Sequence, residues 1–282
     1  MISTGIREYL RPASLEEAWA AIAQCGSAAS PVGGGIDVRL YATPNTTTLV
    51  DLAGLGLGYV RDAHGLAIGA TTTFTEILES TPAKGYLDGI LVDVLERVAS
   101  PLQRNVGTVG GTLGSAHPWS DVIPLLLVLD AALLLYDGRE RVLPLEEYLA
   151  ARASAERPLI VEVRLPMPPP SSMGAFEAFT RTGFDVSILN CACLVSAEAG
   201  RCRAARIAVG GTPALATRLP AVERALTDAP LDDPTIDRIA ALAGETIDAR
   251  DDRRASAEYR RDLARVGLSR CLRRISEAGG NG

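Results

Sequence analysis

Residues 103–112 read QRNVGTVGGT, and together with PVGGGIDV at residues 31–38 they decide the architecture that the sequence predicts. Both stretches contain adjacent glycines, and residues 103–112 also contain threonine hydroxyls. Consecutive glycines allow a tight turn and bring backbone N–H groups close to an anion, although a plain turn between a strand and the next element has the same composition. Two such loops in the first half of the chain indicate a site that holds a pyrophosphate from two sides without positive charge.

No common nucleotide-binding or hydrolase motif accompanies these loops. The sequence lacks the GxGxxG dinucleotide fingerprint, the GxxxxGK[ST] phosphate loop, the GxSxG elbow and the HExxH zinc motif. His64 and His117 are its two histidines, which leaves little material for acid–base catalysis or for a metal site. We therefore expect no catalytic side chain and no metal ligand on this chain, and a bound cofactor that supplies the chemistry.

The composition is typical of a globular protein, with 47% hydrophobic and 22% charged residues in 282. The formal charge of −6 argues against nucleic acid as a partner. The longest apolar run, residues 123–136, is shorter than the roughly 20 residues of a membrane helix, and no signal peptide is visible, so we expect a cytoplasmic protein without a membrane span. Five cysteines lack CxxC spacing, and Cys191 and Cys193 are expected in a core.

Helix signals are clear in the first hundred residues. Capping boxes at Ser14–Glu17 and Thr73–Glu76 predict helices that begin there, and the first helix should end near Gly26. The apolar spacing predicts a third helix over residues 89–99, and residues 103–112 are predicted to be a loop.

Strands are predicted around these helices, at residues 48–52, 66–70, 131–136 and 159–165. Asp137-Gly138 is a hairpin signal, and the last strand alternates apolar residues with Glu162 and Arg164, which is typical of a half-buried strand. The proline-rich residues 166–172 follow as a stiff connector. Beyond it the pattern predicts three strands and then three helices, at residues 175–180, 187–197, 203–209, 219–226, 235–247 and 255–275. We expect a small antiparallel sheet covered by helices, which makes the chain α+β.

An ordered set of motifs carries a family resemblance. The motifs are PVGGGIDV (31–38), QRNVGTVGGT (103–112), SAHPWSD (115–121), DA (130–131), LEEY (145–148), IAVGGTP (207–213) and YRR (259–261). In this order they resemble the FAD-binding medium subunit of the molybdenum hydroxylases, the xanthine dehydrogenase and aerobic carbon monoxide dehydrogenase family. The resemblance implies a two-lobed PCMH-type FAD-binding domain at residues 1–170, with lobes of roughly 1–58 and 59–170, and a C-terminal α+β domain at residues 171–282.

The same resemblance implies a set of cofactor-binding residues. The two glycine loops would bind the FAD pyrophosphate largely through backbone N–H groups, and they comprise Val32, Gly33, Gly34, Gly35, Ile36 and Asp37, and Thr108, Val109, Gly110, Gly111 and Thr112. Asp121 would lie by the ribityl or phosphate region, although its place before residues 122–124 is equally that of a helix cap. Ile160 would pack on the isoalloxazine ring. Trp119 can stack on a flat ring or pack on the surface.

Four positions depart from the pattern of the family. Ile36 stands where relatives carry a polar residue, and Ala116-His117-Pro118 replaces the usual Ala-Ser-Pro or Ala-Asp-Pro. Thr182 stands where an arginine is common, and Ala178 stands where several relatives have a lysine that approaches the flavin or NAD⁺. The absence of that lysine puts NAD⁺ in doubt as the electron acceptor.

The function implied by the resemblance is that of an FAD-binding electron-transfer subunit. It would take electrons from a 2Fe-2S subunit and pass them to an external acceptor, while a large subunit holds the molybdenum cofactor, in a heterotrimer or its dimer. Two alternatives stay open: a self-contained flavoprotein reductase or oxidase of similar fold, and a flavin-free assembly subunit, which Ile36 and Ala178 motivate.

Overall fold

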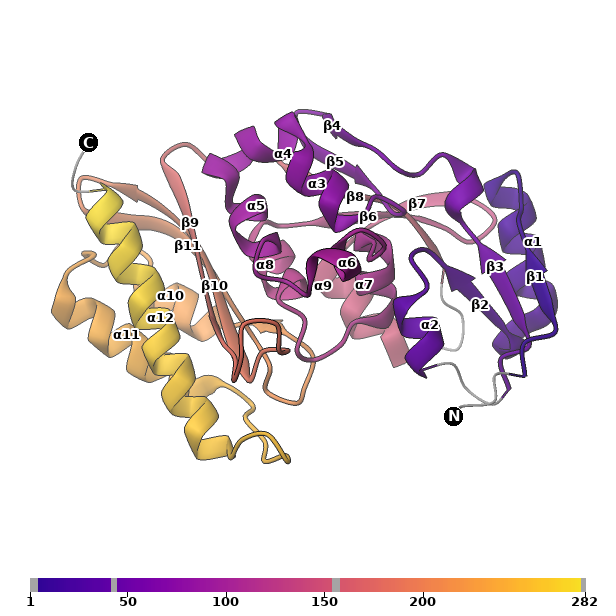
Figure 1. Cartoon of the computed structure of the whole chain (residues 1–282). Coiled ribbons are helices and arrows are strands. Elements are labelled where there is room, and N and C mark those ends of the chain that lie inside the picture. Colours follow the sequence, from indigo (N-terminus) through magenta and orange to yellow (C-terminus); the bar gives the residue numbers. More distant parts are fainter. Residues whose placement is uncertain (1–4, 42–44, 154–157, 280–282) are drawn as a thin grey trace. The chain divides into compact units, whose positions relative to one another are not determined.

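The computed structural model describes residues 5–41, 45–153 and 158–279 (Figure 1). The chain forms two compact units that are interleaved in sequence. Unit 1 contains the described residues up to Ala83, Ser100–Ser115 and Ala132–Leu165, and unit 2 contains Lys84–Ala99, Ala116–Ala131 and the described residues from Pro166 on. The domain boundary at residue 170 and the lobe boundary near residue 58 stay predictions.

The first sheet of unit 1 is parallel and has the strand order β1-β3-β2. Its strands are β1 (Glu8–Leu10), β2 (Ala29–Val32) and β3 (Thr48–Asp51). Helix α1 (Leu15–Cys25) packs on β2 and β3, and its first turn is capped by Ser14, whose hydroxyl accepts the Glu17 N–H at 3.2 Å. This confirms the helix start that the capping box predicted, and the helix ends at Gly26, where φ is +56°.

The second sheet of unit 1 has the strand order β4-β5-β8-β6-β7. Its strands are β4 (Val60–Asp62), β5 (Gly65–Gly69), β6 (Ala132–Tyr136), β7 (Glu140–Pro144) and β8 (Leu159–Pro166). The β6–β7 hairpin turns at Asp137-Gly138, as predicted. The prediction of a half-buried β8 is wrong at Glu162, which is 1% exposed. β8 is the central strand of this sheet, so both of its faces are covered. It also has a bulge at Val161, between the pairs Leu134–Glu162 and Leu135–Ile160, which interrupts the alternation of faces along the strand.

The helices of unit 1 are short: α2 (Ile36–Tyr41), α3 (Phe74–Glu79), α6 (Pro101–Arg104), α7 (Val109–Ser115) and α9 (Leu145–Ala150), and α4 (Thr81–Gly85) runs across the division between the units. Helix α3 begins with the predicted capping box at Thr73–Glu76. The prediction of a loop over residues 103–112 is wrong at its two ends, because α6 includes Arg104 and α7 begins at Val109. Contacts of residues 109 and 110 with Thr72 and Ala70 hold this glycine-rich segment in a helix despite its low propensity.

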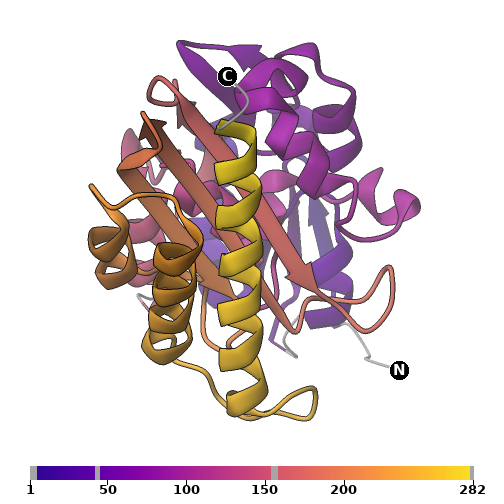
Figure 2. The ribbon, with the colours of Figure 1, turned by 90° about the vertical axis from the view of Figure 1, so that its left-hand side faces the viewer.

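Unit 2 is built on an antiparallel sheet with the strand order β12-β11-β10-β9. Its strands are β9 (Ser172–Phe179), β10 (Leu189–Glu198), β11 (Arg201–Gly210) and β12 (Thr217–Arg218). Helices α10 (Pro220–Leu226), α11 (Asp233–Thr246) and α12 (Ala257–Gly279) cover one face, and Figure 2 shows α12 running across the strands. Cys191 and Cys193 lie fully buried in this core, which confirms the expected packing.

The opposite face of the same sheet is covered by α8 (Val122–Val128), all of whose residues are buried, and α5 (Ile90–Leu95) packs against α8 and β9. The third predicted helix therefore ends at Leu95 rather than near Ala99. The expected small antiparallel sheet with helices is confirmed, and the chain as a whole mixes helices and sheets in the α+β arrangement.

Candidate functional site: a cradle of two glycine loops

The two glycine loops lie against each other within unit 1. A Cβ atom added to Gly34 would lie 1.5 Å from the carbonyl oxygen of Val106, and one added to Gly33 would lie 2.5 Å from Oγ1 of Thr108. Only glycine allows so close an approach of one loop to the other. The structure therefore brings residues 33–35 and 106–108 together, and we call this pair of loops the glycine cradle.

The first loop of the cradle runs from the end of β2 to the start of α2. Gly35 adopts a φ of +74°, a conformation that favours glycine. The N–H groups of Gly33, Gly34 and Gly35 donate to no acceptor among the described residues. A run of unpaired N–H groups in a turn is a site where an anion is stabilised. Val32 is buried and anchors the loop to β2, and Asp37 lies in the first turn of α2.

Most of the backbone donors of the second loop are already used inside the protein. Val109 donates to the carbonyl of Thr72 at 3.1 Å and Gly110 to that of Ala70 at 2.9 Å. Gly111 donates to the Thr108 hydroxyl at 3.1 Å, and Thr112 to the Thr108 carbonyl at 3.0 Å. The N–H of Thr108 donates to no acceptor among the described residues, so the second loop supplies this one N–H and its hydroxyl groups to the cradle, while the first loop supplies three N–H donors.

Ile160 and Glu162 occupy opposite faces of β8. Across the bulge Ile160 pairs with buried Leu135, and the next residue, Val161, accepts a hydrogen bond from the Ala70 N–H that ties β8 to the cradle. Glu162 accepts hydrogen bonds from Tyr59 at 2.7 Å and from Arg164 at 2.6 Å. Burial opposes ionisation, but the hydrogen bonds from Arg164, Tyr59 and Arg61 outweigh it and lower the pKa of Glu162.

The contact with Glu162 also changes the pKa of Tyr59. Burial first, and then the Glu162 carboxylate, raise the pKa of Tyr59 to about 12. Arg61 also lies 4.7 Å from the centre of the Tyr59 ring. Arg61 and Arg164 balance the charge of the Glu162 carboxylate, which stays ionised. Its role is structural, because it connects the central strand β8 with Arg61 of the edge strand β4.

Asp121 lies in unit 2, at the N-terminus of α8, where its side chain does not cap the helix. Its Oδ1 accepts a hydrogen bond from the Ser187 hydroxyl and another from Nδ2 of Asn190, each at 2.6 Å. Burial raises the pKa of Asp121, and these two bonds offset part of that rise. The contacts with Ser187 and Asn190 could not be predicted from local sequence signals, because these residues are 66 and 69 positions away in the chain.

Neighbouring contacts join the loop at residues 117–121 to the sheet of unit 2. Asn190 also donates to the carbonyl of Ser120, and the N–H of Gly211 donates to that of Pro118 at 2.7 Å. The rings of His117 and Trp119 stack with centroids 4.6 Å apart and an angle of 7° between their planes. One face of Trp119 is therefore already covered by His117.

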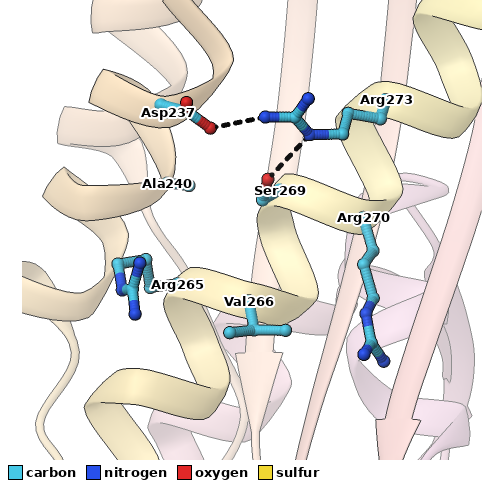
Figure 3. A pocket seen from close by; sticks show the side chains of 7 residues that line it. All are labelled: Asp237, Ala240, Arg265, Val266, Ser269, Arg270 and Arg273. Carbon is cyan, nitrogen blue, oxygen red and sulfur yellow. Dashed lines mark hydrogen bonds and ion pairs between the residues drawn. The ribbon is translucent and has the colours of Figure 1, made fainter. Parts of the chain in front are cut away.

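A hollow in unit 2, of about 330 Å³, lies between α11 and α12 (Figure 3). Its arginines are paired within the protein. Arg273 donates to Asp237 at 2.6 Å and to the Ser269 hydroxyl at 3.3 Å, and Arg270 forms an ion pair with Glu177 at 2.9 Å. We assign this hollow to the packing of the two helices. No group of three potential metal-ligating side chains occurs in the described ranges, and no helix in them is long and apolar enough to cross a bilayer.

Comparison with known proteins now gives the class. Residues 4–168 match the family model of the FAD binding domain in molybdopterin dehydrogenase, and residues 174–275 match that of the CO dehydrogenase flavoprotein C-terminal domain. The chain is thus an FAD-binding oxidoreductase subunit. It belongs to the family of medium subunits of the molybdenum hydroxylases, as the motifs indicated.

Similar proteins span the same length. The chain is 32% identical to the 6-hydroxypseudooxynicotine dehydrogenase complex subunit alpha of Paenarthrobacter nicotinovorans, over 94% of this chain and 93% of the relative. It is 31% identical to the carbon monoxide dehydrogenase medium chain of Afipia carboxidovorans, over 96% of each chain. The structure of reconstituted CO dehydrogenase from Oligotropha carboxidovorans contains a similar chain, with a TM-score of 0.90, 30% identity and coverage of 98% and 99%.

Proposed function

We propose that this chain binds FAD in the glycine cradle and passes electrons from a 2Fe-2S cluster on a partner subunit to an external acceptor. The cradle is the observation that carries the proposal. Its first loop presents the N–H groups of Gly33, Gly34 and Gly35, which suit the two phosphates of FAD, and the fit needs no lysine or arginine. FAD, when bound, supplies redox chemistry that connects one-electron clusters with two-electron acceptors.

The individual site residues stay proposals. Val32 and Ile36 hold the ends of the first loop, and Asp37 follows it in α2. Thr108, buried between Gly33 and Gly111, fixes the distance between the loops, and Val109, Gly110 and Thr112 form the first turn of α7 beside it. We assign Ile160 to contact with the isoalloxazine ring and Asp121 to a ribityl or phosphate contact. Ile36 brings no hydroxyl, but the N–H donors before it do not depend on its side chain.

We propose that NAD⁺ is disfavoured as the electron acceptor, because Ala178 stands where several relatives carry a lysine that approaches the flavin or NAD⁺. Ala178 pairs with Asn190 across β9 and β10, and paired side chains lie on the same face of a sheet. Asn190 in turn contacts Asp121. A lysine at position 178 would therefore lie near Asp121 and balance its charge, whereas alanine brings no charge to that carboxyl, which accepts hydrogen bonds from Ser187 and Asn190.

The partners follow from the family. A small subunit with 2Fe-2S clusters and a large subunit with the molybdenum cofactor would complete a heterotrimer or its dimer. Similarity to a 6-hydroxypseudooxynicotine dehydrogenase complex subunit and to a carbon monoxide dehydrogenase medium chain supports such a complex and leaves the organic substrate open. Cytoplasmic location stays a prediction. No side chain of the cradle can act as a general acid or base, so a self-contained reductase or oxidase is a less well supported hypothesis than an electron-transfer subunit.

The test uses the full chain together with its 2Fe-2S and molybdenum subunits. Flavin absorbance of the purified complex, followed after the substrate of the complex or dithionite is added under anaerobic conditions, should bleach and then recover with an added quinone or oxygen but not with NAD⁺. A complex that is active but contains no flavin supports the flavin-free assembly role instead. Turnover of an organic substrate by this chain alone supports the self-contained flavoenzyme.

A further inference from the structure

Helix α7 has a sequence that forms helix poorly. Its seven residues, VGGTLGS, include Gly110, Gly111 and Gly114. Each glycine lowers the helix-forming equilibrium about fivefold relative to alanine, and a helix this short has no stability of its own. The glycine cradle depends on this helix because the second loop continues into its first turn. Other parts of the protein must therefore hold α7.

The N-terminal end of α7 is held by the contacts already described. The carbonyls of Thr72 and Ala70 accept the N–H groups of Val109 and Gly110, and the side chains of Val109 and Leu113 are buried. The C-terminal end is different, because the last four carbonyls of any helix lack partners within it. Those carbonyls belong to residues 112–115.

Arg152 occupies the C-terminal end of α7. Its Nη1 donates to the carbonyl of Leu113 at 3.1 Å and to that of Gly114 at 2.8 Å, and its Nη2 donates to that of Ser115 at 2.9 Å. A guanidinium presents several N–H groups in a rigid fork, and a cation at this end also suits the helix dipole. One side chain thus satisfies three consecutive carbonyls, 37 to 39 residues away in the chain.

We propose that Arg152 is a positioning residue for FAD: it holds α7 in register from its far end and thereby keeps the second loop of the cradle against the first. The inference rests on the proposed function. Arg152 itself is assigned no contact with the cofactor. Its effect passes through the helix: in the first turn of α7 the Gly111 N–H donates to the Thr108 hydroxyl, and that hydroxyl lies against Gly33 of the first loop.

The first experiment compares the dissociation constant of FAD for the full-length parent chain, Arg152→Ala and Arg141→Ala, each shown to be folded by circular dichroism. Arg141 is the matched control, because its guanidinium is paired with Asp137 in the β6–β7 hairpin of the same unit. We expect Arg152→Ala to raise the dissociation constant about tenfold and Arg141→Ala to leave it within about twofold, since the lost bonds are made by a charged donor to three carbonyls.

Two further variants separate positioning from general loss of stability. Arg152→Lys should recover little affinity, because a single ammonium lacks the fork that reaches three carbonyls. Adding Gly114→Ala to Arg152→Ala should recover much of it: nothing lies within 4 Å of a Cβ at Gly114, so alanine there adds helix propensity without a clash. Added guanidinium at millimolar concentration should also restore FAD binding to Arg152→Ala alone.

The outcomes are distinguishable. A parent chain that takes up no FAD, alone or in its complex, contradicts the proposed function and this inference with it. A parent that binds FAD while folded Arg152→Ala binds it equally well contradicts the inference alone. Loss of affinity that neither Gly114→Ala nor guanidinium reverses also contradicts it, because the defect then does not lie in the order of α7.

Discussion

Two glycines of the same short helix should respond in opposite ways to alanine. In Gly110→Ala the new Cβ would lie 2.6 Å from the carbonyl oxygen and 2.7 Å from the Cβ of Ala70, whereas in Gly114→Ala it would meet nothing within 4 Å. Both changes add one methyl group and the same helix propensity to α7. The difference between them therefore reports the packing of the second loop against Ala70.

The magnitudes follow from these distances. Alanine in place of helical glycine is worth about 1 kcal/mol, so Gly114→Ala should raise the free energy of unfolding by roughly that amount. Forcing a methyl group into a packed site costs about 1–3 kcal/mol, so Gly110→Ala should lower the free energy of unfolding by up to about 2 kcal/mol after the same propensity gain. It also displaces the 2.9 Å hydrogen bond from Gly110 to Ala70.

Urea unfolding and FAD titration of the full chain measure the two effects. Gly114→Ala should bind FAD at least as well as the parent, and Gly110→Ala should raise the dissociation constant about tenfold, because each 1.4 kcal/mol that reaches the bound state is a factor of ten. Equal stability and equal FAD affinity in the two variants would refute the reasoning, since it would show that the Ala70 contact does not shape the cradle.

Three further predictions concern two buried carboxyl groups and one position that differs from the family pattern. The pKa of Asp121 is raised in the folded state, so the free energy of unfolding falls as the pH rises from the unfolded pKa through the folded pKa. Asp121→Asn keeps an acceptor for Ser187 and Asn190, and urea unfolding should show that it is more stable than the parent at neutral pH and equally stable in acid. The pKa of Glu162 is lowered in the folded state, so its carboxylate stabilises the protein above the unfolded pKa of about 4.3, and this stabilisation is lost as the pH falls through the folded pKa. In urea unfolding, Glu162→Gln should therefore have a free energy of unfolding about 1–2 kcal/mol below that of the parent at neutral pH, with a smaller difference in acid. Ala178→Lys should lower the pKa of Asp121, read from carboxyl chemical shifts, and an unchanged pKa would place the lysine away from that carboxyl.

The local signals in the sequence predicted much of the fold. The hydroxyl and carboxyl groups of Ser14–Glu17 and Thr73–Glu76 act within one turn, so the helix starts could be read from spacing alone. The turn at Asp137-Gly138 is equally local. The glycine loops could be found for the same reason, although their contact with each other could not.

What the sequence could not predict depends on distant partners. Helix α7 exists because Ala70, Thr72 and Arg152 hold a segment whose own composition favours a loop. The burial of Glu162 depends on a bulge, which changes the faces of β8 without a mark in the sequence. The hydrogen bonds of Asp121 come from β10 and the segment before it, so the cap and ligand interpretations could not be separated beforehand.

The most direct test of the central claim is an FAD titration of the full-length chain, alone and in complex with its 2Fe-2S and molybdenum subunits, followed by the quenching of flavin fluorescence. The account predicts stoichiometric uptake of one FAD per chain, weakened in Gly110→Ala and in Arg152→Ala and retained in Gly114→Ala. A folded chain that takes up no FAD in either setting, or FAD uptake that is unchanged in both Gly110→Ala and Arg152→Ala, would contradict the assignment of the cofactor to the glycine cradle.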